Sequence, residues 1–264
     1  MQTMISTSAL TRRFGPFCAV DALDLDVEAG EIFGLVGRNG AGKTTTIKML
    51  TTLLPPSSGS AAISGFDVMR QAARVRRVIG YVPQALSADS ELTGYENLLV
   101  FARLYDIPHR EQRRRIEEAL AFMDLADSAG RLVRSYSGGM IRRLEIAQST
   151  LHRPQVLFLD EPTVGLDPLA RHVVWEHVKR LNREFGTTVV VTTHYMDEAE
   201  ALCRRIAVMH RGALAAVDTP VGLKARVGPQ ATLDQAFAQL TGGTENDVAY
   251  DETSRTRRAA DRLG

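Results

Sequence analysis

The sequence is poor in the features that mark disulfide-bonded and membrane-spanning proteins. Only two cysteines, Cys18 and Cys203, occur in 264 residues, and their spacing fits neither a disulfide framework nor a metal site. No apolar run approaches the roughly 20 residues that cross a bilayer, and the first residues lack the apolar stretch of a signal peptide. We therefore predict reduced, packed thiols in a cytoplasmic protein, so that another chain must supply any membrane crossing.

An excess of charge of one sign is also missing. The 32 Lys and Arg residues nearly balance the 31 Asp and Glu residues, for a net charge of +1. A balanced chain has no global field that would hold nucleic acid, so we expect no nucleic-acid partner. The 44% hydrophobic and 24% charged fractions exclude a disordered chain, a collagen and a coiled coil.

Strand and helix patterns alternate near both ends of the chain, with a mainly helical stretch between them. Alternation over 23–27 indicates a half-buried strand, and apolar runs at 32–36, 156–159, 188–192 and 206–209 are typical of buried strands. Helices are predicted over 43–54, 93–105, 110–123, 138–154, 168–185 and 196–203. We expect an α/β fold in which a mostly parallel sheet core is accompanied by an antiparallel β part, and into which a helical subdomain at about 85–153 is inserted.

The best-defined motif is a glycine-rich loop between a buried strand and a helix. Residues 37–44, GRNGAGKT, fit the phosphate-binding pattern G-x-x-x-x-G-K-[ST] without a mismatch. Glycines let backbone N–H groups point at phosphates, and the following helix presents its positive end to the same anion. Lys43 adds a charge for the β- and γ-phosphates, and the Thr44 hydroxyl can bind Mg²⁺. The expected nucleotide contacts of the loop are Gly37, Arg38, Asn39, Gly40, Ala41, Gly42, Lys43, Thr44 and Thr45.

Further polar residues follow the predicted strands at their carboxyl ends, where open α/β sheets bind ligands. Asp160 is placed to hold the Mg²⁺ shell, and Glu161 could polarise a water for attack on the γ-phosphate. His194 follows the strand 188–192 and could contact the γ-phosphate or orient that water. Gln84, where a short strand meets the helical insertion, is a candidate γ-phosphate sensor.

A second anion-binding device lies within the helical stretch. Ser137, Gly138 and Gly139 precede a predicted helix and supply a hydroxyl, small residues and a positive helix end. One nucleotide does not need two such devices on separate parts of one chain. We infer that this second device serves a nucleotide held by another copy.

Together these residues resemble the ATP-binding-cassette (ABC) ATPases, the P-loop NTPases that energise ABC transporters. Six motifs of that family occur in its order over residues 3 to about 220. They are the phosphate loop at 37–45, a Q-loop at Gln84, a signature at 136–140, a Walker B strand and glutamate at 156–161, a D-loop at 165–167 and a switch histidine at His194. Phe14 falls where the family places an aromatic that stacks on adenine.

The resemblance implies roles and partners. It implies a head-to-tail homodimer or heterodimer in which each ATP lies between one chain's phosphate loop and the other's signature. Catalysis would use Glu161, His194 and Lys43, and Asp167 would serve communication across the dimer. Thr44, Gln84 and Asp160 would hold Mg²⁺, with Asp160 acting through a water. A separate integral-membrane permease would hold the chain at the cytoplasmic face of the membrane.

Two positions of the signature depart from the family pattern. The family usually begins this motif with Leu and ends it with Gln, where Tyr136 and Met140 stand. We expect activity to survive, because the serine and glycines supply the phosphate contacts. Phe14 can stack but has no hydroxyl, so discrimination among bases should be loose.

The predicted organisation has three parts. An ABC ATPase domain over 1–220 is followed by a short helical extension over 221–243 and a polar, mobile tail over 244–264. Residues 231–242, ATLDQAFAQLTG, are similar to the ending of ATPases in ABC-2 type drug exporters, including the daunorubicin and doxorubicin resistance subfamily. The function expected is therefore ATP hydrolysis that powers export of a drug-like or lipid-like substrate through the permease.

Three alternatives are weighed against this function. A soluble ABC-type ATPase acting on ribosomes or nucleic acid keeps the cassette, but the single cassette and balanced charge argue against it. A P-loop kinase or GTPase would leave residues 137–139 and His194 unexplained. A non-catalytic binding module is disfavoured because Asp160 and Glu161 are both present.

Overall fold

A six-stranded sheet forms the centre of the protein in the computed structural model, which describes residues 2–242. The strand order is β10-β9-β3-β8-β7-β6, and only the pairing of β10 with β9 is antiparallel. The strands are β3 (Ile32–Val36), β6 (Ile79–Val82), β7 (Val156–Asp160), β8 (Thr188–Thr193), β9 (Arg205–His210) and β10 (Ala213–Asp218). The predicted α/β class with a mostly parallel core is confirmed.

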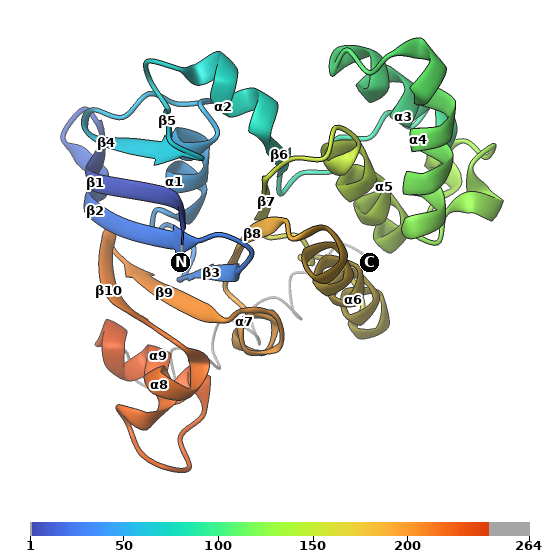
Figure 1. Ribbon diagram of the computed structural model, residues 1–264. Helices are drawn as coiled ribbons and strands as arrows, with labels where there is room; N and C mark the ends of the chain where they lie inside the picture. Colours follow the sequence, from blue (N-terminus) through green and yellow to red (C-terminus); the bar gives the residue numbers. More distant parts are fainter. Residues whose placement is uncertain (1, 243–264) are drawn as a thin grey trace.

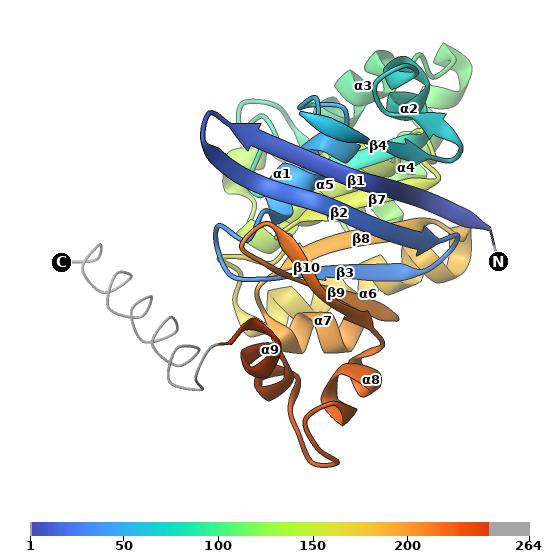
Figure 2. The same cartoon turned by 90° about the vertical axis from the view of Figure 1, so that its left-hand side faces the viewer.

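A second, antiparallel sheet of four strands lies beside the first (Figure 2). Its order is β2-β1-β4-β5, formed by β1 (Thr3–Phe14), β2 (Phe17–Glu28), β4 (Ser58–Ile63) and β5 (Phe66–Asp67). In β2, Leu23, Leu25 and Val27 are buried while Asp24 and Asp26 are exposed, so one face meets the core and one meets solvent. The alternation over 23–27 therefore marks a real strand, although that strand is longer than predicted.

Helices cover the large sheet and build the inserted subdomain (Figure 1). Helix α1 (Lys43–Leu50) contacts β2, β4 and β7, which places it between the two sheets, and α2 (Ala72–Val78) follows β5. The other face carries α6 (Pro168–Phe185) and α7 (Met196–Leu202). The subdomain contains α3 (Gly94–Leu104), α4 (His109–Phe122) and α5 (Gly138–Thr150), with short 3-10 turns at Ala126–Ser128 and Val133–Ser135. The chain continues after β10 into α8 (Pro220–Ala225) and α9 (Leu233–Thr241).

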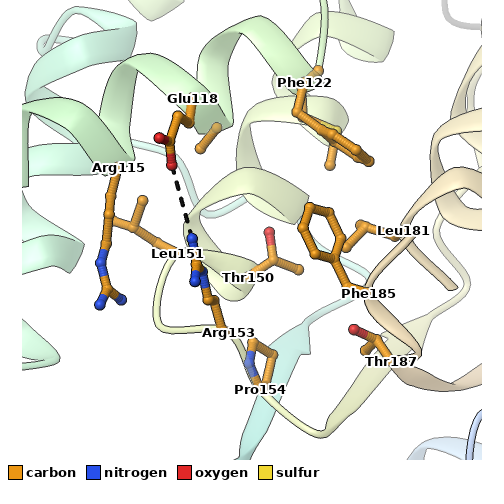
Figure 3. A pocket seen from close by; sticks show the side chains of 12 residues that line it. Arg115, Glu118, Phe122, Thr150, Leu151, Arg153, Pro154, Leu181, Phe185 and Thr187 are labelled. Atoms are coloured by element: carbon orange, nitrogen blue, oxygen red, sulfur yellow. Dashed lines mark ion pairs between the residues drawn. The ribbon is translucent and has the colours of Figure 1, made fainter. Parts of the chain in front are cut away.

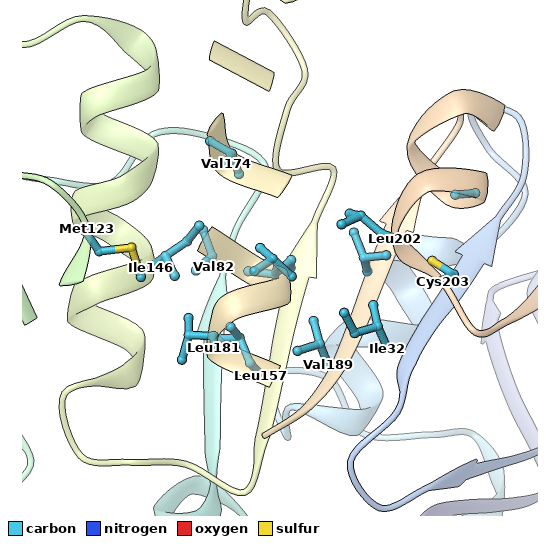
Figure 4. Packing of buried hydrophobic residues seen from close by; sticks show 14 of the residues in the cluster. Ile32, Val82, Met123, Ile146, Leu157, Val174, Leu181, Val189, Leu202 and Cys203 are labelled. Atoms are coloured by element: carbon cyan, nitrogen blue, oxygen red, sulfur yellow. The ribbon is translucent and has the colours of Figure 1, made fainter. Parts of the chain in front are cut away.

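One apolar cluster joins the helical subdomain to the sheet (Figure 4). Met123 after α4, Ile146 of α5, Leu157 of β7 and Leu181 of α6 are all buried in it. The subdomain is therefore attached by core packing as well as by its two chain connections.

Two helices end earlier than predicted, for a local backbone reason. The helix predicted over 43–54 ends at Leu50, and the one predicted over 138–154 ends at Thr150. Thr52 and Arg153 have φ values of 65° and 59°, so each takes a left-handed conformation that a helix cannot continue through.

Several other expectations concern the two ends and the cysteines. The extension predicted over 221–243 contains α8 and α9, joined by a non-helical stretch over 226–232, whereas residue 243 and the predicted tail over 244–264 lie outside the described residues. Cys18 and Cys203 are both free; Cys203 is buried as predicted, whereas Cys18 is only half-buried. Within residues 2–242, no helix combines the length and the apolar character needed to cross a membrane.

Candidate nucleotide site

The phosphate loop lies between β3 and α1, and its glycines are required by close contacts. A Cβ atom on Gly37 would lie 2.7 Å from the carbonyl oxygen of Met209, and one on Gly42 would lie 2.5 Å from that of Ala19. Gly42 also has a φ of +102°, and Gly40 has one of +82°, both in the region that favours glycine. The loop backbone is thus pressed against β2 and β9, which fixes the direction of its N–H groups.

The side chain of Lys43 is held inside the loop that precedes it. Its Nζ donates to the carbonyl oxygens of Gly37 at 2.7 Å and Arg38 at 3.3 Å. Only 4% of the Lys43 surface is exposed, whereas Arg38, Asn39 and Gly40 are exposed. The ammonium charge therefore sits in the concave side of the loop, where it can meet an anion that the loop amides bind.

Glu161 is the centre to which the predicted catalytic residues converge. Its Oε1 lies 3.2 Å from Lys43 Nζ and 3.1 Å from His194 Nδ1. Its Oε2 accepts a hydrogen bond from Gln84 Nε2 at 3.2 Å. Glu161 is 5% exposed and has a φ of 49°, and its N–H donates to both the carbonyl oxygen and Oγ1 of Thr192 at 3.0 Å.

The electrostatic surroundings keep Glu161 ionised. Burial raises the pKa of Glu161, but the hydrogen bonds and charges of His194 and Lys43 together lower it by more. The pKa of Glu161 therefore lies below its ordinary value. At neutral pH the carboxylate is available to accept a proton or a hydrogen bond.

Asp160 and Thr44 form a set of oxygen donors beside this centre. Thr44 Oγ1 donates to Asp160 Oδ1 at 3.2 Å, and Thr192 Oγ1 donates to the same oxygen at 2.5 Å. Because the side-chain amide nitrogen of Gln84 donates to Glu161, the side-chain amide oxygen of Gln84 is the atom left to face a cation. A hydroxyl, a carboxylate and an amide oxygen are ligands that suit Mg²⁺, so the residues present fit the predicted ion.

The second anion-binding device lies at the N-terminus of α5. Ser137 is the N-cap residue, and both Ser137 and Gly138 are exposed. A Cβ atom on Gly138 would lie 3.1 Å from Leu166, and one on Gly139 would lie 3.0 Å from Ala170. The glycines thus allow the signature loop to pack closely against the D-loop and the start of α6 in the same chain.

Asp167 and Phe14 lie at two other edges of the site. Asp167 is the N-cap of α6, and its Oδ1 accepts from the N–H of Ala170 at 2.9 Å. Phe14 ends β1 with 46% of its surface exposed, and the guanidinium of Arg12 lies 4.6 Å from its ring centroid. The guanidinium of Arg12 covers one face of the Phe14 ring, and the exposed part of the ring is available to stack on a base.

Tyr136, the first departure from the family signature, is anchored inside the helical subdomain. It is 7% exposed, and its hydroxyl donates to the carbonyl oxygen of Ser128 at 2.6 Å. The second departure, Met140, donates its N–H to Ser137 Oγ at 3.3 Å, a bond that any residue at this position could make. Tyr136 therefore replaces a family leucine with a side chain that also ties the loop over 126–135 to α5.

Sequence reasoning missed two contributors to this site. Thr192 binds both Asp160 and Glu161, and a hydroxyl at the carboxyl end of a predicted strand was the signal that could have identified it. Arg12 lies two residues before Phe14 on β1, so it shares a face of the strand with that ring. That spacing was also visible in the sequence.

A cavity of about 420 Å³ lies between the helical subdomain and the core (Figure 3). Arg115, Glu118 and Phe122 of α4 line one side, and Leu181 and Phe185 of α6 line the other. The connection from α5 to β7 forms its floor, and Arg153 in that connection lies 3.9 Å from Glu118. This surface combines apolar rings with charged side chains.

Comparisons with known proteins agree with this geometry. A family described as ABC transporter matches residues 20–164. The chain is 46% identical over 86% of its length to the daunorubicin resistance ATP-binding protein DrrA3 of Streptomyces coeruleorubidus, of which it covers 71%. It is 47% identical over 85% of its length to the daunorubicin/doxorubicin resistance ATP-binding protein DrrA of Streptomyces peucetius, of which it covers 68%.

Solved structures give the same result. An ATP-binding subunit of an ABC transporter superposes with a TM-score of 0.79 at 28% identity, covering 90% of this chain and 99% of that one. The structure of cbiO1 from Clostridium perfringens, part of the ABC transporter complex cbiONQ, has a TM-score of 0.79 at 26% identity and covers 85% of this chain and 92% of that one. The chain therefore belongs to the ABC transporter family, as an ATP-binding subunit that hydrolyses ATP.

Proposed function

We propose that Glu161 is the general base for ATP hydrolysis in this chain, and that the chain powers export through a separate membrane subunit. The observation that carries the catalytic proposal is the buried carboxylate of Glu161, held between Lys43, His194 and Gln84. A water beside Glu161 attacks the γ-phosphorus, the bond from that phosphorus to the bridging oxygen breaks, and the water's proton passes to the carboxylate. ADP and inorganic phosphate leave.

The other residues bind and orient. The loop amides and Lys43 hold the β- and γ-phosphates, and His194 contacts the γ-phosphate from the carboxyl end of β8. Thr44, Gln84 and Asp160 would hold Mg²⁺, Asp160 through a water, and the ion would neutralise charge on the phosphate oxygens. Phe14 stacks on the adenine.

Two chains complete each site in this proposal. Ser137 and Gly138 are exposed at the positive end of α5, and the phosphate loop of the same chain already has its own anion-binding amides. A two-fold dimer places the signature of one chain over the nucleotide held by the other, and the partner can be a second copy or a related chain. Asp167, beside the signature loop, is then positioned at the same junction.

The transport partner is an integral-membrane permease, which places this chain at the cytoplasmic face of the membrane. We expect the permease to dock near the helical subdomain between Gln84 and Leu151, and Leu151 also lines the cavity of Figure 3. The relatives are named as daunorubicin or doxorubicin resistance ATP-binding proteins, and these names support export of a drug-like or lipid-like substrate. A soluble role on ribosomes or nucleic acid is the alternative.

Mixing two inactive variants tests the shared site. Lys43→Ala removes the phosphate-loop charge, and Ser137→Arg blocks the signature. Each variant alone should be inactive, and Ser137→Arg should still bind ATP as a monomer. Half of the dimers formed at random are mixed and each holds one complete site, so the mixture should recover about a quarter of the native rate. No recovery would contradict the shared site.

Cross-linking tests the membrane partner. In a background without Cys18, a cysteine at Glu118 in the cavity should cross-link to a co-expressed permease. A cysteine at the exposed Ser60 of β4 serves as the matched control and should not cross-link. Equal labelling at both positions would count against docking at the helical subdomain. Failure of the chain to associate with membranes even when the permease is co-expressed would favour the alternative.

A further inference from the structure

Arg142 is a buried cation that the proposed chemistry does not use. It lies on α5, five residues after Ser137, and only 2% of its surface is exposed. Its Nη1 donates to the carbonyl oxygen of Pro83 at 2.7 Å, and its Nη2 donates to that of Gln84 at 2.8 Å. A guanidinium fork thus binds two successive carbonyls of the backbone that carries Gln84.

Glu145 extends the same attachment to the far end of that loop. Its Oε2 lies 2.9 Å from Arg142 Nη1, and it too is 2% exposed. Its Oε1 accepts hydrogen bonds from the N–H of Ser87 and from Ser87 Oγ, the latter at 3.1 Å. The loop over 83–87 is therefore bound to α5 at both ends, although Gln84, Ala85, Leu86 and Ser87 are themselves exposed.

This attachment has a direct route to the catalytic carboxylate. The backbone of Gln84 is held by Arg142, and the side chain of Gln84 donates to Glu161. A loop of exposed residues would otherwise sample many conformations, and fixing one of them costs conformational entropy. The buried ion pair supplies that restraint, because Arg142 Nη2 and Glu145 Oε1 have their hydrogen-bond partners only when the loop is in place.

We propose that Arg142 and Glu145 are positioning residues that fix Gln84 against Glu161, so that the signature helix itself sets the geometry of the Q-loop. Since α5 also begins with Ser137, a movement of the helix that brings Ser137 onto the partner's nucleotide also moves Gln84 in its own site. This second consequence rests on the shared site proposed above, whereas the positioning of Gln84 does not.

A double-mutant cycle on the full chain tests the positioning. Arg142→Met should lower kcat for ATP hydrolysis by about 10- to 100-fold, as expected when a catalytic group is misplaced by about 1 Å. The effect should nearly vanish in a Gln84→Ala background, because the residue that Arg142 positions is then gone. Additive losses in the two backgrounds would overturn the proposal.

Arg143→Met is the matched control. Arg143 is the next residue of α5 and also binds carbonyls, those of Met123 at 2.6 Å and Asp124 at 3.3 Å, but these lie at the end of α4. Arg143→Met should lower the stability of the protein, and the size of its effect should be the same whether Gln84 is present or replaced by alanine. If Arg142→Met fails to fold, Arg142→Lys keeps the charge but not the fork, and it should show the same dependence on Gln84.

The mixed dimer separates positioning from a general weakening of α5. In the Lys43→Ala and Ser137→Arg mixture, the complete site takes Gln84 and Glu161 from the Ser137→Arg chain. Adding Arg142→Met to that chain should lower the recovered activity by the same factor of about 10 to 100, although the signature of that chain is already blocked. If the recovered activity fell only when Arg142→Met is on the Lys43→Ala chain, the proposal would be overturned. If the mixture recovered no activity even without Arg142→Met, that result would contradict the shared site instead.

Discussion

Replacing Glu161 by glutamine removes one charge from the centre of the site while keeping the shape of the side chain. The two oxygens of Glu161 have different neighbours: Oε1 faces Lys43 and His194, and Oε2 faces the amide nitrogen of Gln84. A glutamine offers only one oxygen, so its NH₂ group must face either the ammonium or the other amide. In either orientation a buried polar contact is lost, which costs about 1–3 kcal/mol of stability.

The catalytic loss should be larger than the structural one. A positioned general base contributes about 10²- to 10⁴-fold to rate, which corresponds to roughly 3–5 kcal/mol of barrier. Binding of ATP should persist or tighten, because the negative charge 3.2 Å from Lys43 Nζ no longer competes with the phosphates. We therefore expect Glu161→Gln to bind ATP, hydrolyse it at least 100-fold more slowly, and accumulate as an ATP-held dimer.

Three measurements check this expectation: phosphate release, equilibrium binding of ATP, and the protein's elution volume with and without ATP. Glu176→Gln is the control for loss of charge alone, because Glu176 lies on α6 with 54% of its side chain exposed and pairs only with Lys179 among the described residues. The control should hydrolyse ATP at the native rate. A native rate for Glu161→Gln would refute the role assigned to Glu161.

Three further predictions concern stability and reactivity. Glu198 is fully buried, and burial raises its pKa above the ordinary 4.5, so its ionisation destabilises the fold as pH rises. Above pH 4.5, Glu198→Gln should therefore have a higher melting temperature than the native chain, and a difference that shrinks with rising pH would refute this. Tyr136→Phe removes the hydroxyl that donates to Ser128 and should cost about 1 kcal/mol in urea unfolding, with an unchanged stability as the contrary result. Burial raises the pKa of the Cys203 thiol, so a disulfide reagent should react with Cys18 alone in the native protein and with both thiols only after unfolding. Rapid reaction of both thiols in the native protein would contradict the burial of Cys203.

Elements with their own end signals could be predicted from the sequence. Helix α6 spans Pro168–Phe185 as predicted, because Asp167 caps its start, Pro168 fits its first turn and Gly186 ends it in a left-handed conformation. Helix α3 likewise begins after the capping box of Thr93, as expected. Local chemistry decides these boundaries.

Elements that depend on partners could not be predicted in the same way. Strand β4 reads SGSAAI, which has no strong alternation and low strand propensity, and it forms because β1 supplies its hydrogen bonds. Strand β10 also depends on its pairing with β9. Their formation is a tertiary effect.

The site shows the same division. The approach of Lys43, Glu161 and His194 could be anticipated, because each follows the carboxyl end of a strand in one parallel sheet. The carbonyl contacts of Arg142 could not, because they depend on how α5 packs beside a loop 58 residues earlier in the chain. Motifs locate groups along the chain, while packing determines which of them touch.

The continuous core between the helical subdomain and the sheet limits how the subdomain can move. Met123, Ile146 and Leu181 are buried in one cluster that spans this junction, so swinging the subdomain freely would expose apolar surface to water. Any change of orientation during the ATP cycle should instead be a shear, a small sliding of α5 past α6 that keeps side chains in contact. Substitutions that lock these two helices together would then stall the cycle without touching a nucleotide ligand.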